Sequence, residues 1–328
     1  MLIRSTWTLT TNQTAVIPRS YCLELVKQLH QQMGLEIGTE QTPSTTFSGL
    51  LGHVTTSQDF YSFDPNEVYQ LSLSGLTENS SKAIASLDLA DSLEFLGAKF
   101  IISDRQNEVT SYEQLYTESV AEEPEPIRQF NLKFVSPTSF SSQGGSLPLP
   151  VPNLMLRSWL EKWNHFAPIY LGGNELVSYL SQAIKIKRHR LQTRNFQLNR
   201  GYVTGFTGNI DLQLPYKVEP LIANVAHLLI QYAAFSGTGM KTRLGMGQTI
   251  TVANSQTSLK DRIWIAILQD IYSADINYFN LLIFQSTSND LNGERGIRTP
   301  VRNKPEIVFE TTAFNHSAIS PESTSLFY

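Results

Sequence analysis

Cysteine is almost absent from this chain of 328 residues, and its absence limits the chemistry available to the protein. The single cysteine, Cys22, excludes a disulfide framework and a cysteine-based zinc site, and is typical of a protein of the reducing cytoplasm. The six histidines are scattered and form no His-Glu-x-x-His pattern, which argues against a dedicated metal site. We therefore expect a cytoplasmic protein that uses no metal or other cofactor.

Long apolar runs are missing as well. No run approaches the roughly 20 residues that a helix needs to cross a bilayer. The first residues, Met-Leu-Ile-Arg-Ser-Thr-Trp, lack the pattern of a signal peptide. We expect no membrane partner, and a chain of this length with 41% hydrophobic residues can form about two domains.

Acidic and basic residues are segregated along the chain, although the formal net charge is only −4. Residues 1–126 contain 6 Lys and Arg against 17 Asp and Glu, a net charge of −11. Residues 127–252 contain 13 Lys and Arg against 4 Asp and Glu, a net charge of +9. Residues 253–328 contain 6 Lys and Arg against 8 Asp and Glu. A basic domain joined to an acidic one indicates an anionic partner for the basic part.

The densest basic run lies at 185–200, where six Lys and Arg residues occur in sixteen positions without an acid. These residues alternate with apolar ones roughly at the period of a strand. A solvated strand face is one interpretation, and contact with RNA or DNA phosphates is the other. We favour nucleic-acid contact, through Lys185, Lys187, Arg188, Arg190 and Arg194.

A glycine-rich segment at 235–247 follows a long apolar helical pattern. Glycine lets a backbone approach a ligand closely, and free backbone N–H groups beside cations can bind phosphate. The segment fits neither the P-loop pattern nor the dinucleotide fingerprint, whereas a hairpin turn without a ligand stays open. We favour the phosphates of a nucleic acid as its ligand, bound by Gly237, Gly239, Lys241, Arg243, Gly245 and Gly247.

The periodicity of the chain predicts two similar halves. The first has strands at 2–10, 67–76 and 98–103 and helical segments at 18–33, 80–87 and 112–118. An acidic linker with two prolines lies at 122–126. The second half has strands at 127–136, 184–198, 201–214 and 247–253, a loop at 141–152, and helices at 153–163, 173–183 and 218–235. Each half resembles a βαββαβ unit, in which helices pack on one face of an antiparallel sheet. Such units are common among RNA binders, but the aromatic signature of base stacking on the sheet is absent.

Several short motifs follow one another along residues 1–252. They are Ile17-Pro18-Arg-Ser-Tyr21, Leu29-His30, Thr46-Phe47-Ser48-Gly-Leu50-Leu-Gly52, Phe134-Val-Ser136-Pro137-Thr138-Ser-Phe140, Leu147-Pro148-x-Pro150, Trp163-Asn164-x-Phe166-Ala-Pro168, Gly205-Phe206-Thr207-Gly208 and the Gly-rich segment. The ordered set resembles the CRISPR-associated endoribonucleases that process precursor CRISPR RNA, the sixth Cas family in the RAMP superfamily.

The resemblance implies an α+β protein of two tandem ferredoxin-like (βαββαβ) domains with the Gly-rich loop near the end of the second. We place the domains at 1–125 and 126–253, with an atypical tail at 254–328. The implied activity is metal-independent cleavage of CRISPR repeat RNA, for the production of guide RNAs in antiviral defence. A homodimer and attachment to a CRISPR effector complex stay open.

RNA cleavage without metal uses the 2′-OH of the substrate as nucleophile, and it leaves a 2′,3′-cyclic phosphate and a 5′-OH. It needs an acid or a base, for which histidine is suited, and positive charge near the transition state. His30 is the candidate, because it borders the apolar face of the first helix and matches the leucine–histidine motif of the family. Some members of the family use a Tyr/His/Lys trio, so Tyr21 and Lys27 are added as candidates. Whether His30 acts as acid or base stays open.

The other histidines have weaker claims. His53 is the reserve candidate, and His189 lies in the basic run and is expected to contact phosphate. His165 and His227 are expected to pack, and His316 lies in the tail. The strings at 292–300 and 314–321 of the tail suggest translation past a lost stop codon, with a genuine extension as the alternative.

Two alternatives to the endoribonuclease remain at this stage. A non-catalytic RAMP subunit that binds guide RNA would share the loop and the basic half without depending on His30. A nucleotide-binding enzyme is disfavoured by the failed loop patterns.

Overall fold

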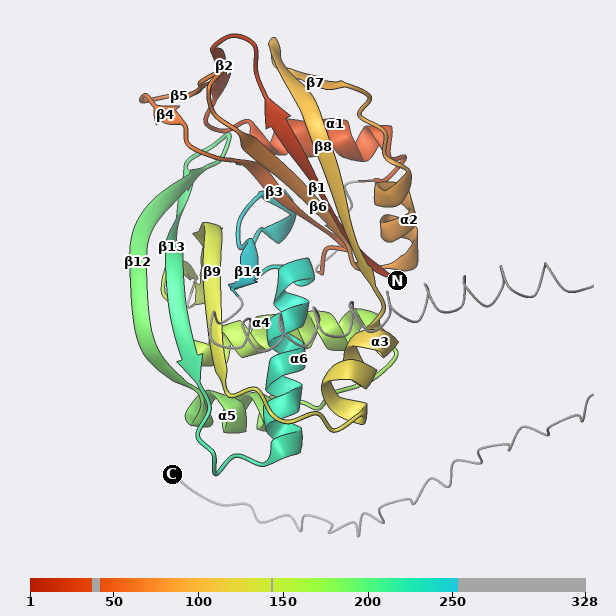
Figure 1. Cartoon of the computed structure of the whole chain (residues 1–328). Coiled ribbons are helices and arrows are strands. Elements are labelled where there is room, and N and C mark those ends of the chain that lie inside the picture. Colours follow the sequence, from red (N-terminus) through yellow and green to blue (C-terminus); the bar gives the residue numbers. More distant parts are fainter. Residues whose placement is uncertain (37–41, 143, 253–328) are drawn as a thin grey trace, which may run out of the picture. The chain divides into compact units, whose positions relative to one another are not determined.

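The computed structural model describes residues 1–36, 42–142 and 144–252, and the predicted tail lies outside the described residues. Its first sheet has the strand order β3-β6-β1-β8-β7, with antiparallel neighbours (Figure 1). Burial alternates along β1 (Leu2–Thr10), as the sequence alternation predicts. The other strands are β3 (Thr45–Leu51), β6 (Tyr69–Gly75), β7 (Ser92–Phe95) and β8 (Ala98–Thr110).

Two helices pack beside this sheet, α1 (Cys22–Gln32) and α2 (Glu78–Ser86). Helix α2 begins at a capping box, in which the side chains of Thr77 and Ser80 each accept from the other's backbone N–H. A small sheet of β2 (Ala15–Pro18), β5 (Phe60–Phe63) and β4 (Thr55–Thr56) extends this half. The core of the half is aromatic and aliphatic, with Trp7, Phe47, Phe63 and Phe100 almost fully buried.

The second sheet has the order β12-β13-β9-β14 and is also antiparallel. Helices border it in Figure 1, and their buried side chains share one core with its strands. The strands are β9 (Gln129–Thr138), β12 (Lys185–Gln197), β13 (Tyr202–Gln213) and β14 (Thr249–Val252). The helices are α3 (Tyr112–Tyr116) with the π-helical turn η1 (Thr117–Ala121), α4 (Pro152–Phe166), α5 (Asn174–Ala183) and α6 (Pro220–Ser236), and a hairpin of β10 (Phe140–Ser142) and β11 (Gly145–Leu147) lies between β9 and α4.

Helix α6 is the apolar centre of the second half, and most of its residues are buried. Within the described residues, no helix is both long and apolar enough to cross a membrane. The C-terminal end of α6 reaches the first half, where the Thr46 hydroxyl donates to the carbonyl of Phe235 over 2.9 Å. The end of α6 therefore brings the Gly-rich loop that follows it to the first sheet.

The structure confirms an α+β fold with antiparallel sheets and differs from the predicted elements in several places, among them the short strands β4, β5 and β7, which were not predicted. Pro18 ends strand β2 instead of opening a helix, because residues 15–18 pair with β5. Strand β3 was not predicted, since its Ser- and Gly-containing sequence bends at a register shift between Phe47 and Leu50. Strand β8 continues to Thr110 because β1 pairs along its full length, and the expected loop at 141–152 contains part of the β10–β11 hairpin.

Candidate active site

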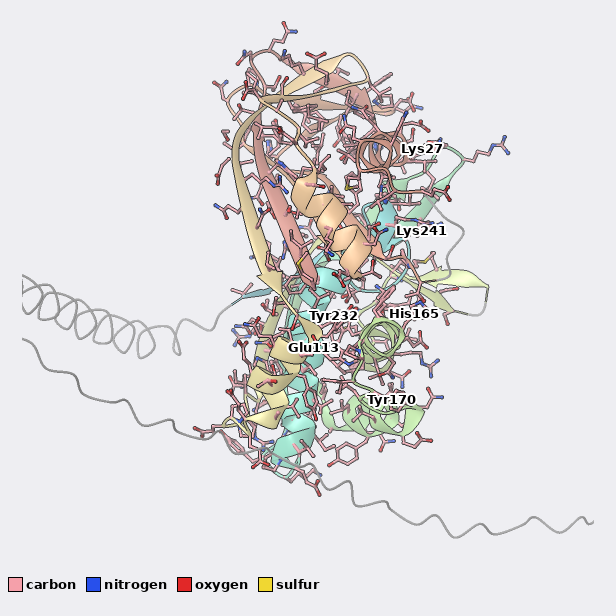
Figure 2. All side chains as sticks on the ribbon, turned by 90° about the vertical axis from the view of Figure 1, so that its right-hand side faces the viewer. Lys27, Glu113, His165, Tyr170, Tyr232 and Lys241 are labelled. Carbon is pink, nitrogen blue, oxygen red and sulfur yellow. The ribbon has the colours of Figure 1, made fainter. Side chains whose placement is uncertain are left out.

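The Gly-rich loop, residues 237–247, connects α6 to β14 and contains the short 3-10 helix η2 (Thr242–Leu244). Helix η2 contacts both α1 and β3 of the first half. In Figure 2 Lys241 lies between α1, marked by Lys27, and α4, marked by His165. The loop thus lies where elements of both halves meet.

One face of α4 holds the start of this loop. The Ser158 hydroxyl accepts from the backbone N–H of Gly239 over 2.9 Å, and the Trp159 indole donates to the Thr238 hydroxyl over 2.8 Å. One turn on, the Lys162 ammonium donates to the carbonyls of Ser236 and Gly237 over 2.8 and 3.1 Å. These carbonyls end α6, where a cation also meets the negative end of the helix dipole.

Two of the loop glycines are required by close backbone packing. A Cβ atom at Gly239 would clash with the carbonyl oxygen of Ser139, and one at Gly247 with that of Thr238, and both have a positive φ. The N–H of Gly239 donates to Ser158 and that of Gly247 to the carbonyl of Pro137. The expectation of bare N–H groups at these glycines is therefore wrong, because the protein itself uses them.

Lys162 is a buried cation that the sequence analysis missed. Burial lowers the pKa of its ammonium from 10.5 to about 7, against the raising effect of the Glu161 carboxylate. The two carbonyl acceptors compensate for part of the lost hydration. Lys162 therefore fixes the junction between α6 and the loop at a cost in desolvation.

His30 lies in the last turn of α1, and only 2% of its surface is exposed. Its Nδ1 is 2.8 Å from the carbonyl oxygen of Val26, and its Nε2 is 3.0 Å from the hydroxyl oxygen of Thr45. A carbonyl can only accept, so Nδ1 carries the proton. In the neutral ring Nε2 then accepts from the Thr45 hydroxyl, and its lone pair is directed at β3.

The surroundings of His30 favour this neutral form. Burial lowers the pKa of the imidazole below its usual 6.5, and the positive charge of Arg243 lowers it further, against the raising effect of the Val26 carbonyl. His30 and Arg243 also line one cavity of about 300 Å³, together with Ser44, Thr45 and Asn79. The fold thus brings together two of the predicted site residues that are far apart in the sequence.

Tyr21 and Lys27 do not line the cavity of His30. The Tyr21 hydroxyl is buried and accepts from the backbone N–H of Leu50 over 2.6 Å, and burial raises its pKa well above 10. Lys27 is exposed and forms an ion pair with Glu24 over 3.0 Å. Neither residue is placed to transfer a proton together with His30.

The basic run forms β12, an edge strand of the second sheet. Its five predicted cations are all exposed. Arg188 and Arg190 pair with Asp211 and Asn209 of β13, while His189 between them pairs with the buried Ile210. Because side chains alternate along a strand, Arg188 and Arg190 share the face of the sheet that is opposite the helices.

The remaining histidines lie apart from this cavity. His53 is exposed, with its Nδ1 3.6 Å from a carboxylate oxygen of Glu67. His165 packs edge-on against Phe166, and His227 stacks on Phe130, where burial lowers its pKa. His316 lies outside the described residues.

Thr45 and Lys162 were not predicted as site residues. Thr45 could have been found only through strand β3, which was itself missed. Lys162 precedes a motif that the analysis quoted, Trp163-Asn164, but a lysine in an amphipathic helix is usually exposed. Nothing in its spacing signals burial.

The family model of the CRISPR-associated endoribonuclease Cas6 matches residues 132–249. A Cas6 endoribonuclease of Streptococcus thermophilus is 32% identical over 121 residues, which cover 36% of this chain and 48% of that protein. One of Mycobacterium tuberculosis is 28% identical over 120 residues, which cover 37% of this chain and 38% of that protein. The matches thus span about half or less of the length of these curated relatives.

Solved structures share the fold over a larger part of the chain. A Cas6 product complex has a TM-score of 0.59 at 19% identity and covers 77% of this chain and 100% of that chain. Cas6 of Thermus thermophilus has a TM-score of 0.56 at 20% identity, and the match covers 77% of this chain and 98% of that chain. A Cas6-related protein of Pyrococcus furiosus has a TM-score of 0.55 at 14% identity and covers 78% and 100%. Together, the family model, the curated relatives and these structures confirm the resemblance to the CRISPR-associated endoribonucleases.

The close packing of the loop predicts unequal effects of two glycine substitutions. Gly247→Ala should lower the free energy of unfolding by about 3 kcal/mol, because its methyl group meets the Thr238 carbonyl at a positive φ. Gly201→Ala has a similar φ but open space around the new methyl, and should cost only about 1 kcal/mol. Urea unfolding measures both, and equal losses would contradict the packing described.

The buried Lys162 predicts a dependence of stability on pH. Between pH 7 and about 10 the lysine of the unfolded chain holds a proton that the folded protein lacks, so the free energy of unfolding rises with pH. The free energy of unfolding should rise by up to about 1.4 kcal/mol per pH unit. Lys162→Met lacks this contribution, so denaturant unfolding of both proteins at pH 7, 8 and 9 should show a growing difference in favour of the wild type. A constant difference would show that the lysine is not desolvated.

Proposed function

We propose that this protein is a metal-independent endoribonuclease that cleaves precursor CRISPR RNA within its repeats. The observation that carries the proposal is the neutral, buried His30 beside Arg243 of the Gly-rich loop. The Cas6 relatives support the substrate class, since solved structures with the same fold are described as product and substrate-mimic complexes. A RAMP protein among them is described as binding different RNA substrates.

We further propose that the two halves are ferredoxin-like domains at 1–125 and 126–253. When the short additional strands are left aside, each half has the element order βαββαβ, with an extra helix in the second. The four main strands of each half can be numbered one to four along the chain. In both sheets they then lie side by side in the order two, three, one, four, as β3-β6-β1-β8 and as β12-β13-β9-β14. This repetition supports an origin of both halves in one supersecondary unit.

In the proposed mechanism, His30 acts first as a base. The 2′-OH of the nucleotide before the cleaved bond displaces the Thr45 hydroxyl from Nε2. Nε2 then takes the 2′-OH proton while the 2′-oxygen attacks the adjacent phosphorus. The Val26 carbonyl keeps the other proton on Nδ1 and stabilises the imidazolium that forms.

The negative charge that develops on the non-bridging oxygens of the phosphate falls beside Arg243. A guanidinium in a partly dehydrated cavity stabilises this charge more than it would in bulk water. The bond to the 5′-oxygen breaks, the imidazolium returns its proton to that oxygen, and the products are a 2′,3′-cyclic phosphate and a 5′-OH. Because the nucleophile belongs to the RNA and the charge is met by the protein, no step requires a metal ion.

The other predicted residues serve the same reaction from a distance. Tyr21 holds β3, the strand that carries Thr45, through its bond from Leu50. Lys27 and the exposed cations of β12 provide positive charge for the RNA backbone, which supplies affinity without reading sequence. We propose that the RNA contacts β12 as well as the Gly-rich loop.

A second candidate function is a non-catalytic RNA-binding subunit of the RAMP type. The observation that favours it is the burial of His30, whose two ring nitrogens both have partners within the protein. In that case His30 would only fix the end of α1 to β3. The two functions differ in their dependence on His30.

The test is cleavage of a labelled cognate repeat RNA in EDTA by the wild type, His30→Gln and, as a matched control, His53→Ala. We expect the wild type and His53→Ala to cut once per repeat and leave a 2′,3′-cyclic phosphate. His30→Gln should bind the RNA with an affinity within about threefold of the wild type and cut at least about 100-fold more slowly, the loss typical of a general base.

Two outcomes contradict the proposal. If all three proteins bind the RNA and none cuts it, the protein is an RNA-binding subunit. If His30→Gln cuts as fast as the wild type, the chemistry lies elsewhere, and the exposed His53 becomes the next candidate.

A further inference from the structure

A second cavity, of about 440 Å³, is lined by the Gly-rich loop and does not include His30. Its walls come from α4, which contributes Arg157, Ser158 and Lys162, and from the loop, which contributes Met240 and Lys241. The function proposed above makes no use of Arg157 or of this cavity.

The two cavities are neighbours along two segments of the chain. Thr242 lines the second cavity and the next residue, Arg243, lines that of His30. In the same way Pro43 lines the second cavity and Ser44 lines that of His30. Consecutive Cα atoms are about 3.8 Å apart, so the walls of the two cavities meet at these residues.

The second cavity is built for an anion. Two cations line it, Arg157 and Lys241, together with the amino group of Lys162, which carries only part of a positive charge near neutral pH, against one carboxylate, that of Glu161. Arg157 is exposed and forms no ion pair within the described residues. Lys162 is buried and donates to the carbonyls of Ser236 and Gly237, so it serves the loop junction more than a ligand.

The conformation of the loop also fits a ligand at this place. Lys241 has a left-handed backbone conformation, with φ 56° and ψ 31°. This conformation is unfavourable for a residue with a side chain and is found most often where function requires it. Among the described residues, no backbone acceptor pairs with the N–H of Lys241, so this N–H and the ammonium are both available to an anion.

We propose that this cavity binds the phosphodiester next to the cleaved one, with Arg157 and Lys241 as its ligands. The proposal rests on the RNA cleavage proposed above. The cavity would hold the strand on both sides of the loop, so that the cleaved bond is placed against Nε2 of His30. Lys162 acts as a positioning residue, because it holds the loop that carries Lys241.

The test combines removal of the protein's charge with removal of the RNA's charge. A repeat RNA with a 2′-deoxy nucleotide at the cleavage position cannot be cut, so its binding can be measured without turnover. Each phosphodiester beside the cleaved one is replaced in turn by a neutral methylphosphonate. The proteins are the wild type, Arg157→Gln and Lys99→Gln, a control whose lysine lies in strand β8 and pairs with Glu94.

We expect one of the two methylphosphonates to weaken binding to the wild type and to Lys99→Gln by about tenfold, the loss of one charge-assisted contact. Arg157→Gln should bind the unmodified RNA about tenfold more weakly than the wild type does. Its affinity should fall little further when the RNA carries that methylphosphonate. Arg157→Gln and Lys99→Gln should also unfold at the same urea concentration as the wild type.

The proposal is overturned if the methylphosphonate weakens binding to Arg157→Gln as much as it weakens binding to the wild type. It is also overturned if neither methylphosphonate affects binding. Failure of the cleavage proposal is recognised separately, because it appears as wild-type protein that does not cut the unmodified RNA. In that case the binding measurements still decide whether Arg157 contacts a phosphate.

Discussion

The attachment of the Gly-rich loop to both halves of the protein is the constraint on which the candidate site depends. On one side α4 holds the loop through Ser158, Trp159 and Lys162. On the other side the first sheet receives hydrogen bonds at its β3 strand, where Gln248 donates to the carbonyl of Phe47 over 3.2 Å. Neither half contains the site alone, since His30 comes from the first and Arg243 from the second.

Most polar groups at this junction are satisfied within the protein. The glycines allow backbones to meet without a Cβ between them, and their N–H groups pair with Ser158 and Pro137. In the function proposed here, phosphate binding by the loop therefore rests on the side chains of Lys241 and Arg243 more than on its glycines. These contacts hold Arg243 beside a ring whose lone pair is directed at the Thr45 hydroxyl. In the proposed reaction, little reorganisation would be needed when an RNA hydroxyl replaces that of Thr45.

Local sequence patterns predicted much of the fold because their periods agree with burial in the folded protein. The alternation of β1 and the apolar faces of α1 and α4 are examples. The sequence did not predict β3, whose Phe47–Leu50 bend disrupts the alternation, or the end of β2 at Pro18, which depends on pairing with a distant strand. Such features are decided by tertiary contacts that no local window contains.

The candidate site was predictable only in part for the same reason. Composition and charge indicated a nucleic-acid partner, and the resemblance to a family singled out His30 and the loop. No spacing in the sequence could show that Arg243 lies beside His30, that Tyr21 is buried against Leu50, or that Lys162 is desolvated. The first of these facts arises from the packing of the two halves together, and the other two arise from tertiary packing within one half.

The most direct test of this account is the titration of His30 by NMR in the wild type and in Arg243→Gln, with His30→Gln used to assign its signals. The account predicts a neutral ring protonated at Nδ1, a pKa below 6.5 in the wild type, and a higher pKa when the charge of Arg243 is removed. A pKa of 6.5 or above that does not respond to Arg243→Gln would show that the loop does not bring its arginine to the histidine, and would contradict the proposed site.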